Sequence, residues 1–333
     1  HFLLFTSYFF PMALFTRTPL SGAPLGGPIR YAVAGSEPQT FDLRLYEADT
    51  RTPLGARRFA GVAAFECDVA PLLRRAVRFT PTTGPTGLRE ATGRTIAVVA
   101  EAAGSVDAPV AASARTFLPT ARATEAPALL GPMPRERLLA PGECDELTLL
   151  HDGALVVTVV ATGGGAECVR TYRTATGGLS LFRLAADDFP GAERIEVDAG
   201  ACGRVGYTLL PAPEGSQRLA WRTAEGSIEH YTFPTVVCET LTVAKRRARG
   251  AEGHMAVATG RERRLHLRSA CEGRAATEAL AGLLEACEAW SCAGEEYRPV
   301  DIVTDRATLH RHGALGTLEV EIRFTREEPL PWS

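Results

Sequence analysis

Lysine is almost missing from this sequence: Lys245 is the only one among 36 lysine and arginine residues. With 39 acidic residues, the formal net charge is -3 and the pI is about 6.2. No excess of one sign therefore draws the whole chain towards nucleic acid or an anionic membrane surface. The preference for arginine is typical of a GC-rich coding sequence, and the charge balance identifies no partner.

Long hydrophobic runs are also missing. The strongest one opens the chain, HFLLFTSYFFP, and it is shorter than the ~20 residues that a membrane-spanning helix requires. It has neither the basic n-region nor the small-residue cleavage site of a signal peptide. We expect it to be translated sequence upstream of a true start at Met12, and we expect neither secretion nor contact with a membrane.

The cysteines lack the spacing of a zinc site or of a disulfide framework. No Cys-x-x-Cys pair occurs, and several cysteines stand where an apolar residue belongs. We interpret them as small buried hydrophobic residues in a reducing compartment. The eight are Cys67, Cys144, Cys168, Cys202, Cys238, Cys271, Cys287 and Cys292.

Catalytic signatures are missing as well. There is no Gly-x-Ser-x-Gly elbow, no His-Glu-x-x-His and no dinucleotide-binding fingerprint. Gly163-Gly164-Gly165 lacks the strand-to-helix context of a phosphate loop, so it predicts a flexible hairpin loop. We expect no enzyme activity, no catalytic or cofactor-binding residues and no cofactor.

Three short polar clusters remain as candidates for metal or anion binding. His310 and His312 would share a face of a strand, but no third ligand is placed beside them. Asp187-Asp188 and Glu143-Cys-Asp-Glu146 match no calcium loop. Lys245-Arg-Arg-Ala-Arg249 is the one dense positive patch, and without interleaved aromatic residues it favours a solvated loop over a nucleic-acid site. We therefore predict no metal site and no nucleic-acid partner.

The first part of the chain predicts strands without helices. Residues 1–27 are predicted to form a disordered leader, rich in proline and glycine from Met12 on. Apolar and polar residues then alternate over 29–33, 41–45, 58–62 and 64–69, and 95–100 is apolar enough for a central strand. Residues 28–120 thus predict a β-sandwich of the immunoglobulin or fibronectin type III kind. The segment 81–90 predicts a long exposed loop on it.

A second set of strands follows the proline- and alanine-rich passage 119–134. Residues 147–160 predict a hairpin that turns at His151-Asp-Gly153, and strands follow at 179–184, 194–198 and 205–210. The aromatic-rich hairpin Leu219–Phe233 ends the set, with its turn at Ala224–Ser227. Residues 121–234 therefore predict a second β-sandwich.

The third part, residues 235–325, combines strands with one helix, and a short tail at 326–333 ends the chain. Apolar residues recur at helical spacing over about 275–290, and Ser269-x-x-Glu272 is a possible start signal. Alternating segments at 300–305 and 317–324 predict the sheet that buries this stripe. The apolar stripe consists of Ala276, Leu280, Leu283, Leu284, Cys287 and Trp290. The whole chain is thus predicted to be mainly β: two sandwiches followed by an antiparallel β domain with one packed helix.

Residues 219–325 resemble structural proteins of tailed-phage and prophage tails or baseplates. The resemblance consists of pattern: Trp221–Gly226, Glu229–Pro234, the Leu-rich helix ending in Trp290, Arg298–Val303 and the closing strand Leu318–Phe324. It implies a virion component, present in the host cytoplasm during assembly. It also implies sandwich domains that assemble into rings or hubs, as homo-oligomers or with neighbouring tail proteins.

Two functions from different classes follow. The first is a non-enzymatic structural or assembly protein, a phage or prophage tail or baseplate component. The second is a cell-surface module whose first two domains bind a glycan or a protein. A glycosidase is a distant third, because no long aromatic-lined domain houses a carboxylate pair.

Overall fold

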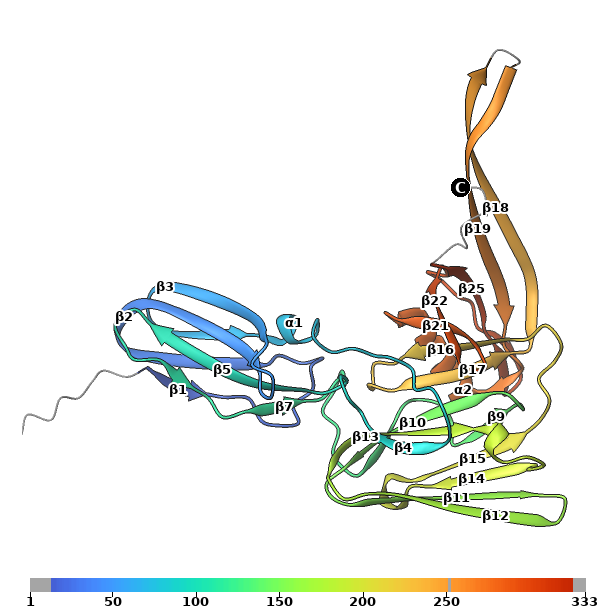
Figure 1. Ribbon diagram of the computed structural model, residues 1–333, viewed down its shortest axis with the longest axis horizontal. Helices are drawn as coiled ribbons and strands as arrows, with labels where there is room; N and C mark the ends of the chain where they lie inside the picture. The colour runs from blue at the N-terminus through green and yellow to red at the C-terminus, as the bar shows by residue number, and fades with distance from the viewer. Residues whose placement is uncertain (1–12, 251–252, 326–333) are drawn as a thin grey trace, which may run out of the picture. The chain divides into compact units, whose positions relative to one another are not determined.

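The computed structural model describes residues 13–250 and 253–325, and 57% of the chain is strand against 7% helix (Figure 1). This confirms the predicted fold class: mainly β, with sandwich modules followed by an antiparallel sheet that carries one packed helix. The chain forms two compact units. Of the described residues, the first holds 13–78 and 91–124, and the second holds 79–90, 125–250 and 253–325.

Six antiparallel strands and a one-turn helix, α1 (Ala70–Leu73), build the first unit. Strand β2 lies between β1 and β3 along its first half and between β5 and β3 along its second, while β6 and β7 both pair with β5. Buried positions alternate along β2 and β5, so their apolar faces supply the core. The strands are β1 (Leu14–Arg17), β2 (Arg30–Glu47), β3 (Pro53–Asp68), β5 (Ile96–Gly104), β6 (Val110–Ala111) and β7 (Arg115–Phe117).

Two strand boundaries in this unit differ from the prediction. Segments 29–33 and 41–45 belong to the single strand β2 and the residue before it. Segments 58–62 and 64–69 belong to the single strand β3 and the residue after it. The alternation is interrupted between these segments, so each was predicted as a separate strand. In the structure, register shifts between Ala34 and Phe41 absorb the irregularity, so the two chains stay paired.

The disordered leader predicted at 1–27 is partly ordered. Leu14–Arg17 pairs with β2, and the amide of Leu25 donates to the carbonyl of Leu118 at 2.9 Å. Gly26 lies so near Ala121 that a Cβ there would be 2.3 Å from its Cα, so the glycine permits this approach. The prediction of a disordered leader is therefore wrong for residues 14–17 and 22–26. Residues 1–12, with the predicted start at Met12, lie outside the described residues, as does the tail 326–333.

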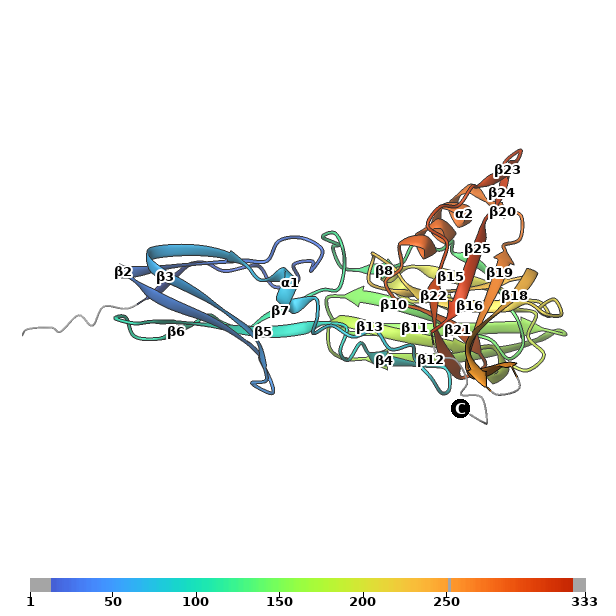
Figure 2. The ribbon, with the colours of Figure 1, turned by 90° about the horizontal axis from the view of Figure 1, so that it is seen from above.

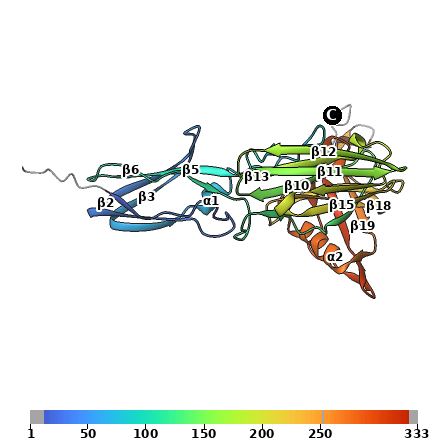
Figure 3. The same cartoon turned by 90° about the horizontal axis from the view of Figure 1, so that it is seen from below.

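The second unit contains the sandwich predicted near 121–234. Its four-stranded sheet has the order β4-β13-β10-β8, and its five-stranded sheet β12-β11-β14-β15-β9, with β12 at one edge (Figure 3). Leucine, valine and aromatic side chains from both sheets fill the space between them. The strands are β4 (Gly87–Glu90), β8 (Ala128–Leu130), β9 (Glu136–Leu139), β10 (Cys144–His151), β11 (Leu155–Gly163), β12 (Ala166–Thr174), β13 (Gly178–Ala185), β14 (Arg194–Asp198) and β15 (Arg204–Leu209).

Two predicted loops of this region have other roles. The turn at 151–153 does not close a hairpin, because β10 lies in one sheet and β11 in the other, so the turn carries the chain between the layers. Segment 81–90 is not an exposed loop of the first domain, since its strand β4 pairs with β13. The loop predicted at Gly163-Gly-Gly165 is confirmed: Gly163 pairs with Ala166, and Gly164 and Gly165 take φ of 58° and 79°.

A seven-stranded sheet with the order β17-β16-β21-β22-β25-β19-β18 follows the sandwich. The predicted hairpin Leu219–Phe233 is present as β16 and β17, but it belongs to this sheet and not to the sandwich, because β16 pairs with β21. The strands are β16 (Gln217–Arg222), β17 (Ile228–Phe233), β18 (Thr235–Gly250), β19 (Gly253–Arg268), β21 (Ala289–Ala293), β22 (Glu296–Ile302) and β25 (Glu319–Phe324).

Helix α2 (Arg274–Ala281) packs on this sheet and lies beside a small sheet of β20 (Glu272–Gly273), β23 (His310–His312) and β24 (Leu315–Thr317) (Figure 2). The helix is shorter than the predicted 275–290. A 3₁₀ turn at Gly282–Glu285 ends it, and Trp290 lies in strand β21. Gly273, not Ser269, occupies the N-cap position.

The predicted apolar stripe is buried only in its first part. Leu280 and Leu283 are fully buried and Leu284 is half-buried, whereas Cys287 is exposed. The interpretation of the cysteines needs the same correction. Cys144, Cys202 and Cys292 are buried, but Cys168, Cys238 and Cys271 are exposed like Cys287, and all eight are free thiols.

We expect Leu283→Asp to lower the free energy of unfolding by at least about 3 kcal/mol, because it places a carboxylate in the apolar core under the sheet. Cys287→Asp, four residues further on and exposed, is the matched control and should change it by less than about 0.5 kcal/mol. Urea denaturation of both variants measures the difference. Equal midpoints would show that the two positions are not buried as described.

Candidate functional site: a projecting hairpin, its base and the joint beneath it

Strands β18 and β19 form a hairpin of 16 residues on each side. Only its base is part of the larger sheet, since β25 pairs with β19 from Arg264 to Arg268. Within the described residues, the rest of the hairpin pairs only with itself, and Figure 1 shows it extending beyond the sheet. We call residues 239–250 and 253–263 the arm.

The arm exposes large apolar side chains. Leu241 is 49% and Val243 46% exposed, and both are on strand β18. The predicted patch Lys245–Arg249 lies on the same strand with exposed side chains, so it is a strand and not a loop. A two-stranded ribbon has marginal stability in water by itself, which makes the arm a surface that a neighbouring molecule would stabilise.

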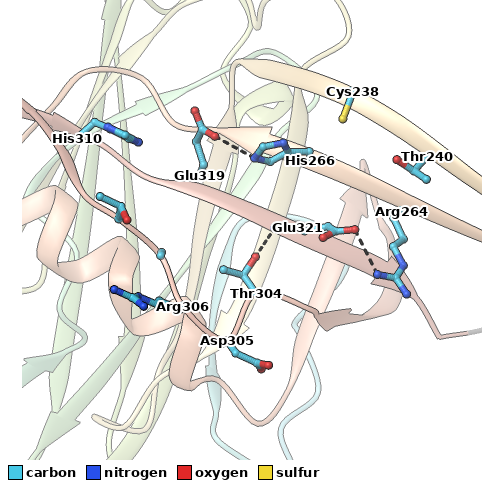
Figure 4. A pocket seen from close by; sticks show the side chains of 12 residues that line it. Cys238, Thr240, Arg264, His266, Thr304, Asp305, Arg306, His310, Glu319 and Glu321 are labelled. Atoms are coloured by element: carbon cyan, nitrogen blue, oxygen red, sulfur yellow. Dashed lines mark hydrogen bonds and ion pairs between the residues drawn. The ribbon is translucent and has the colours of Figure 1, made fainter.

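A polar pocket of about 540 Å³ lies at the base of the arm (Figure 4). Strands β18, β19 and β25 form one side of it, and the segment between β22 and β23 forms the other. Its lining consists of Cys238, Thr240, Arg264, His266, Thr304, Asp305, Arg306, Ala307, Thr308, His310, Glu319 and Glu321.

Ion pairs hold Glu319 and Glu321, two of the acidic side chains of this pocket. Glu319 accepts a hydrogen bond from Nε of Arg268 at 2.6 Å, which lowers its pKa, and its other oxygen is 3.0 Å from Nε2 of His266. The amide of Glu321 donates to the Thr304 hydroxyl at 2.7 Å. The pocket therefore offers charged and hydroxyl groups suited to a polar ligand.

The sequence candidates are not brought together. His310 lines the pocket, and His312 is two residues on in β23. Among the residues that the structure describes, no group of three or more His, Cys, Asp or Glu side chains is placed to hold a metal ion. Asp187 and Asp188 accept amide hydrogen bonds from Gly142 and Thr86 at 2.7 and 2.6 Å, so they fix loops.

The acidic cluster at 143–146 is part of a buried joint between the sandwich and the seven-stranded sheet. Nη1 of Arg137 on β9 lies 2.8 Å from Oδ2 of Asp145 and 3.0 Å from Oε2 of Glu229 on β17. His230 is 3.2 Å from the other Asp145 oxygen. All four side chains are at most 6% exposed.

A second part of the joint is centred on Arg218 of β16. Its guanidinium donates to the carboxylate of Glu143 at 3.0 Å and to the carbonyl of Cys144 at 2.6 Å. The thiol of Cys144 lies 3.1 Å from the hydroxyl of Tyr297, on β22. We call these two parts together the ionic joint. The sequence signal for it was the presence of charged residues, such as Glu229 and His230, inside apolar strands.

Gly131 permits the close packing of the joint. Its φ is 121°, and a Cβ at this position would lie 1.8 Å from Oε1 of Glu229. That oxygen also accepts a hydrogen bond from the hydroxyl of Ser227. A side chain at residue 131 would therefore displace the carboxylate from the joint.

Burial and the nearby charges shift the pKa values of Glu229, Asp145 and His230 in the ionic joint. Burial, helped by the nearby charge of Asp145, outweighs the opposing effect of Arg137 and raises the pKa of Glu229 to about 7. Burial acts on Asp145 in the same direction, but Arg137 and His230 outweigh it and hold its pKa well below the ordinary range. Burial lowers the pKa of His230.

No protein-family model matches the chain, and no curated protein sequence matches it. Similar solved structures include extracellular domains 3–5 of Drosophila OTK, at 10% identity over 78% of this chain and 92% of that one, with a TM-score of 0.25. The fibronectin(III)-like modules of Clostridium thermocellum CbhA match at 12% identity over 60% and 94%, with a TM-score of 0.19. At such scores these similarities carry no argument about function. Among the described residues, no helix is long and apolar enough to cross a membrane.

The pKa of Glu229 predicts a pH-dependent stability. Because it is raised in the folded state, the contribution of this group is fully present below the unfolded pKa of 4.5 and is lost as the pH rises through about 7. The lowered pKa of His230 makes the unfolding free energy rise with pH, which opposes the effect of Glu229. Comparison with Glu229→Gln isolates the contribution of Glu229. Relative to the parent, this variant should gain about 3 kcal/mol in unfolding free energy between pH 4.5 and 8.

Urea denaturation at pH 4.5, 6, 7 and 8 measures this gain. Glu196→Gln, on the exposed side of the sandwich strand β14, is a control that should show no comparable change. A constant difference between Glu229→Gln and the parent at every pH would contradict the prediction.

Proposed function

We propose that this protein is a non-enzymatic structural component that assembles with neighbouring subunits, specifically a tail or baseplate component of a phage or prophage. The observation that carries the proposal is the arm, a long two-stranded ribbon with exposed apolar side chains and no third strand along it within the described residues. Natural proteins cover or blunt such edges unless a partner uses them.

The remainder of the second unit supports this role. The ionic joint links the sandwich to the seven-stranded sheet through buried ion pairs, so the base of the arm is held on a packed body. A rigid base with a projecting strand pair is suited to contacts between subunits, either in a homo-oligomer or with other tail proteins. The resemblance of residues 219–325 to tail proteins makes the virion the proposed location, with the host cytoplasm as the place of assembly.

The pocket at the base of the arm favours a second candidate, a glycan- or protein-binding module. Its threonine hydroxyls, histidines and carboxylates could bind the hydroxyl groups of a saccharide. Two results together would favour this candidate over assembly. The protein would bind a glycan array and lose that binding in His266→Ala, and it would form no complex with the products of the adjacent genes.

Removing the arm tests the proposal. Thr240 and Arg264 are paired, so an Asn-Gly turn can join them in place of residues 241–263. We expect the shortened protein to keep the thermal unfolding transition of its body within a few degrees. It should no longer co-sediment with the products of the adjacent genes, whereas the full-length chain should.

Circular dichroism of the shortened protein is the control for folding. Co-sedimentation that persists without the arm would contradict the proposed assembly role of the arm. The gene neighbourhood provides an independent check, since tail-tube, tape-measure or baseplate genes are expected beside this one.

A further inference from the structure

The two faces of the arm differ in charge. In an antiparallel pair, opposed residues lie on the same face and successive residues alternate between faces. Leu241 is paired with Arg263, and Val243 with Arg261. Every second residue after Val243 on β18 lies on the same face, and these residues are three more cations. We call this set the basic face: Leu241, Val243, Lys245, Arg247, Arg249, Arg261 and Arg263. Glu239, two residues before Leu241, ends this face at the base of the arm, where it pairs with Arg263 at 2.6 Å.

The opposite face is neutral by comparison. Along β18 it carries Thr240, Thr242 and Ala244, and the only cation of this strand on it is Arg246. Glu262 is opposite Thr242. The register shift between Arg246 and Arg247 places its extra residue on β19, where Arg246 pairs with Ala258 and Arg247 with Ala256, so the alternation along β18 continues. The asymmetry therefore reaches the end of the arm.

The spacing of the cations matches an extended partner. Lys245, Arg247 and Arg249 are two residues apart, and alternate residues of a strand are about 7 Å apart. Their side chains are all exposed. A third strand with carboxylates at every second residue would place them at the same spacing, opposite these cations. The outer edge of β18, which pairs only with β19 in the described part of the chain, supplies the backbone groups for such a strand.

Two features favour a protein partner over a nucleic acid. Leu241 and Val243 continue the basic face towards the base, where they offer apolar contact area that a phosphate backbone does not use. The arm contains no Phe, Tyr or Trp, the residues on which bases stack.

We propose that the arm binds an acidic, extended protein segment, which adds as a strand to β18 with its carboxylates on the basic face and apolar side chains against Leu241 and Val243. This rests on the proposed function, since it names the chemistry of the neighbouring subunit. The interaction is β-strand addition with electrostatic selection of the partner.

Adjacent residues of the arm provide a matched test. Arg247→Glu reverses a charge on the basic face, and Arg246→Glu reverses one on the opposite face, so the change in net charge is the same. The probe is a fluorescein-labelled peptide of nine residues with Glu at positions 1, 3 and 5, Val at 7 and 9, and Thr between them. Added antiparallel to β18, it places its Glu and Val side chains on the basic face. Fluorescence anisotropy with the full-length protein follows the binding. We expect Arg247→Glu to weaken binding at least about fivefold and Arg246→Glu less than about twofold.

Three further measurements fix the interpretation. A peptide with proline in place of two of the threonines keeps the basic-face side chains but cannot form the added ladder, and it should bind at least about tenfold more weakly. Raising the salt from 0.05 to 0.5 M should weaken binding of the parent peptide, since the cations are exposed. Unfolding transitions of the two variants should match that of the parent, which shows that the arm variants fold.

Several results would overturn the inference. Equal effects of the two substitutions would show that charge alone, not the face, governs binding. A 20-base-pair DNA duplex that binds more tightly than the peptide would make the partner a polyanion. A dimer of the protein alone, lost in Arg247→Glu, would make it a second copy. If removal of the arm abolishes assembly while Arg247→Glu does not, the proposed function stands and this inference fails.

Discussion

The body of the second unit depends on strand β10 being buried on both faces. The sandwich covers one side and strand β17 of the seven-stranded sheet lies against the other, so all eight residues of β10 are buried. Such a strand cannot leave its polar groups to water, and Asp145 must find partners inside the protein. Arg137 and His230 supply them, and Arg137 also pairs with the neighbouring Glu229. Two layers that would otherwise be separate domains are thereby joined by paired charges, whose removal one at a time leaves an uncompensated charge.

This joint gives the arm its base. Strand β18 follows β17 after a single residue, Pro234. Strand β19 returns to the sheet and pairs with β25, where both strands contribute side chains to the core that also contains α2. Leu265 and Leu267 bury their side chains there, while the side chains of residues 239–249 on β18 are exposed. The transition from buried leucines to exposed cations along one face marks where the protein's own core ends. Beyond that point the alternation of side chains continues without a core to bury it, as expected for a surface that a second molecule covers.

The sequence predicts the parts of this fold whose signals are local. The hairpin of β16 and β17 follows from alternating aromatic residues, and the turn at Gly164-Gly165 from the need for positive φ. Long-range pairing overrides such signals elsewhere. The leucine stripe predicts a helix to Trp290, but that residue pairs with β16 and β22 and is in a strand. The ionic joint could not be predicted from the sequence, because Glu229 is far from Arg137 and Asp145 in the chain and meets them only when two sheets pack. The basic patch was visible as Lys245–Arg249, whereas its division between two faces requires the strand register.

The central claim is that the arm gains a strand from a neighbouring subunit. Hydrogen exchange of the backbone amides, compared between the isolated protein and its assembly with the products of the adjacent genes, tests it directly. The account predicts that amides of residues 240–249 exchange at least about tenfold more slowly in the assembly, while those of β16 and β21 in the core of the sheet do not change. Exchange of residues 240–249 that is as fast in the assembly as in the isolated protein would contradict it.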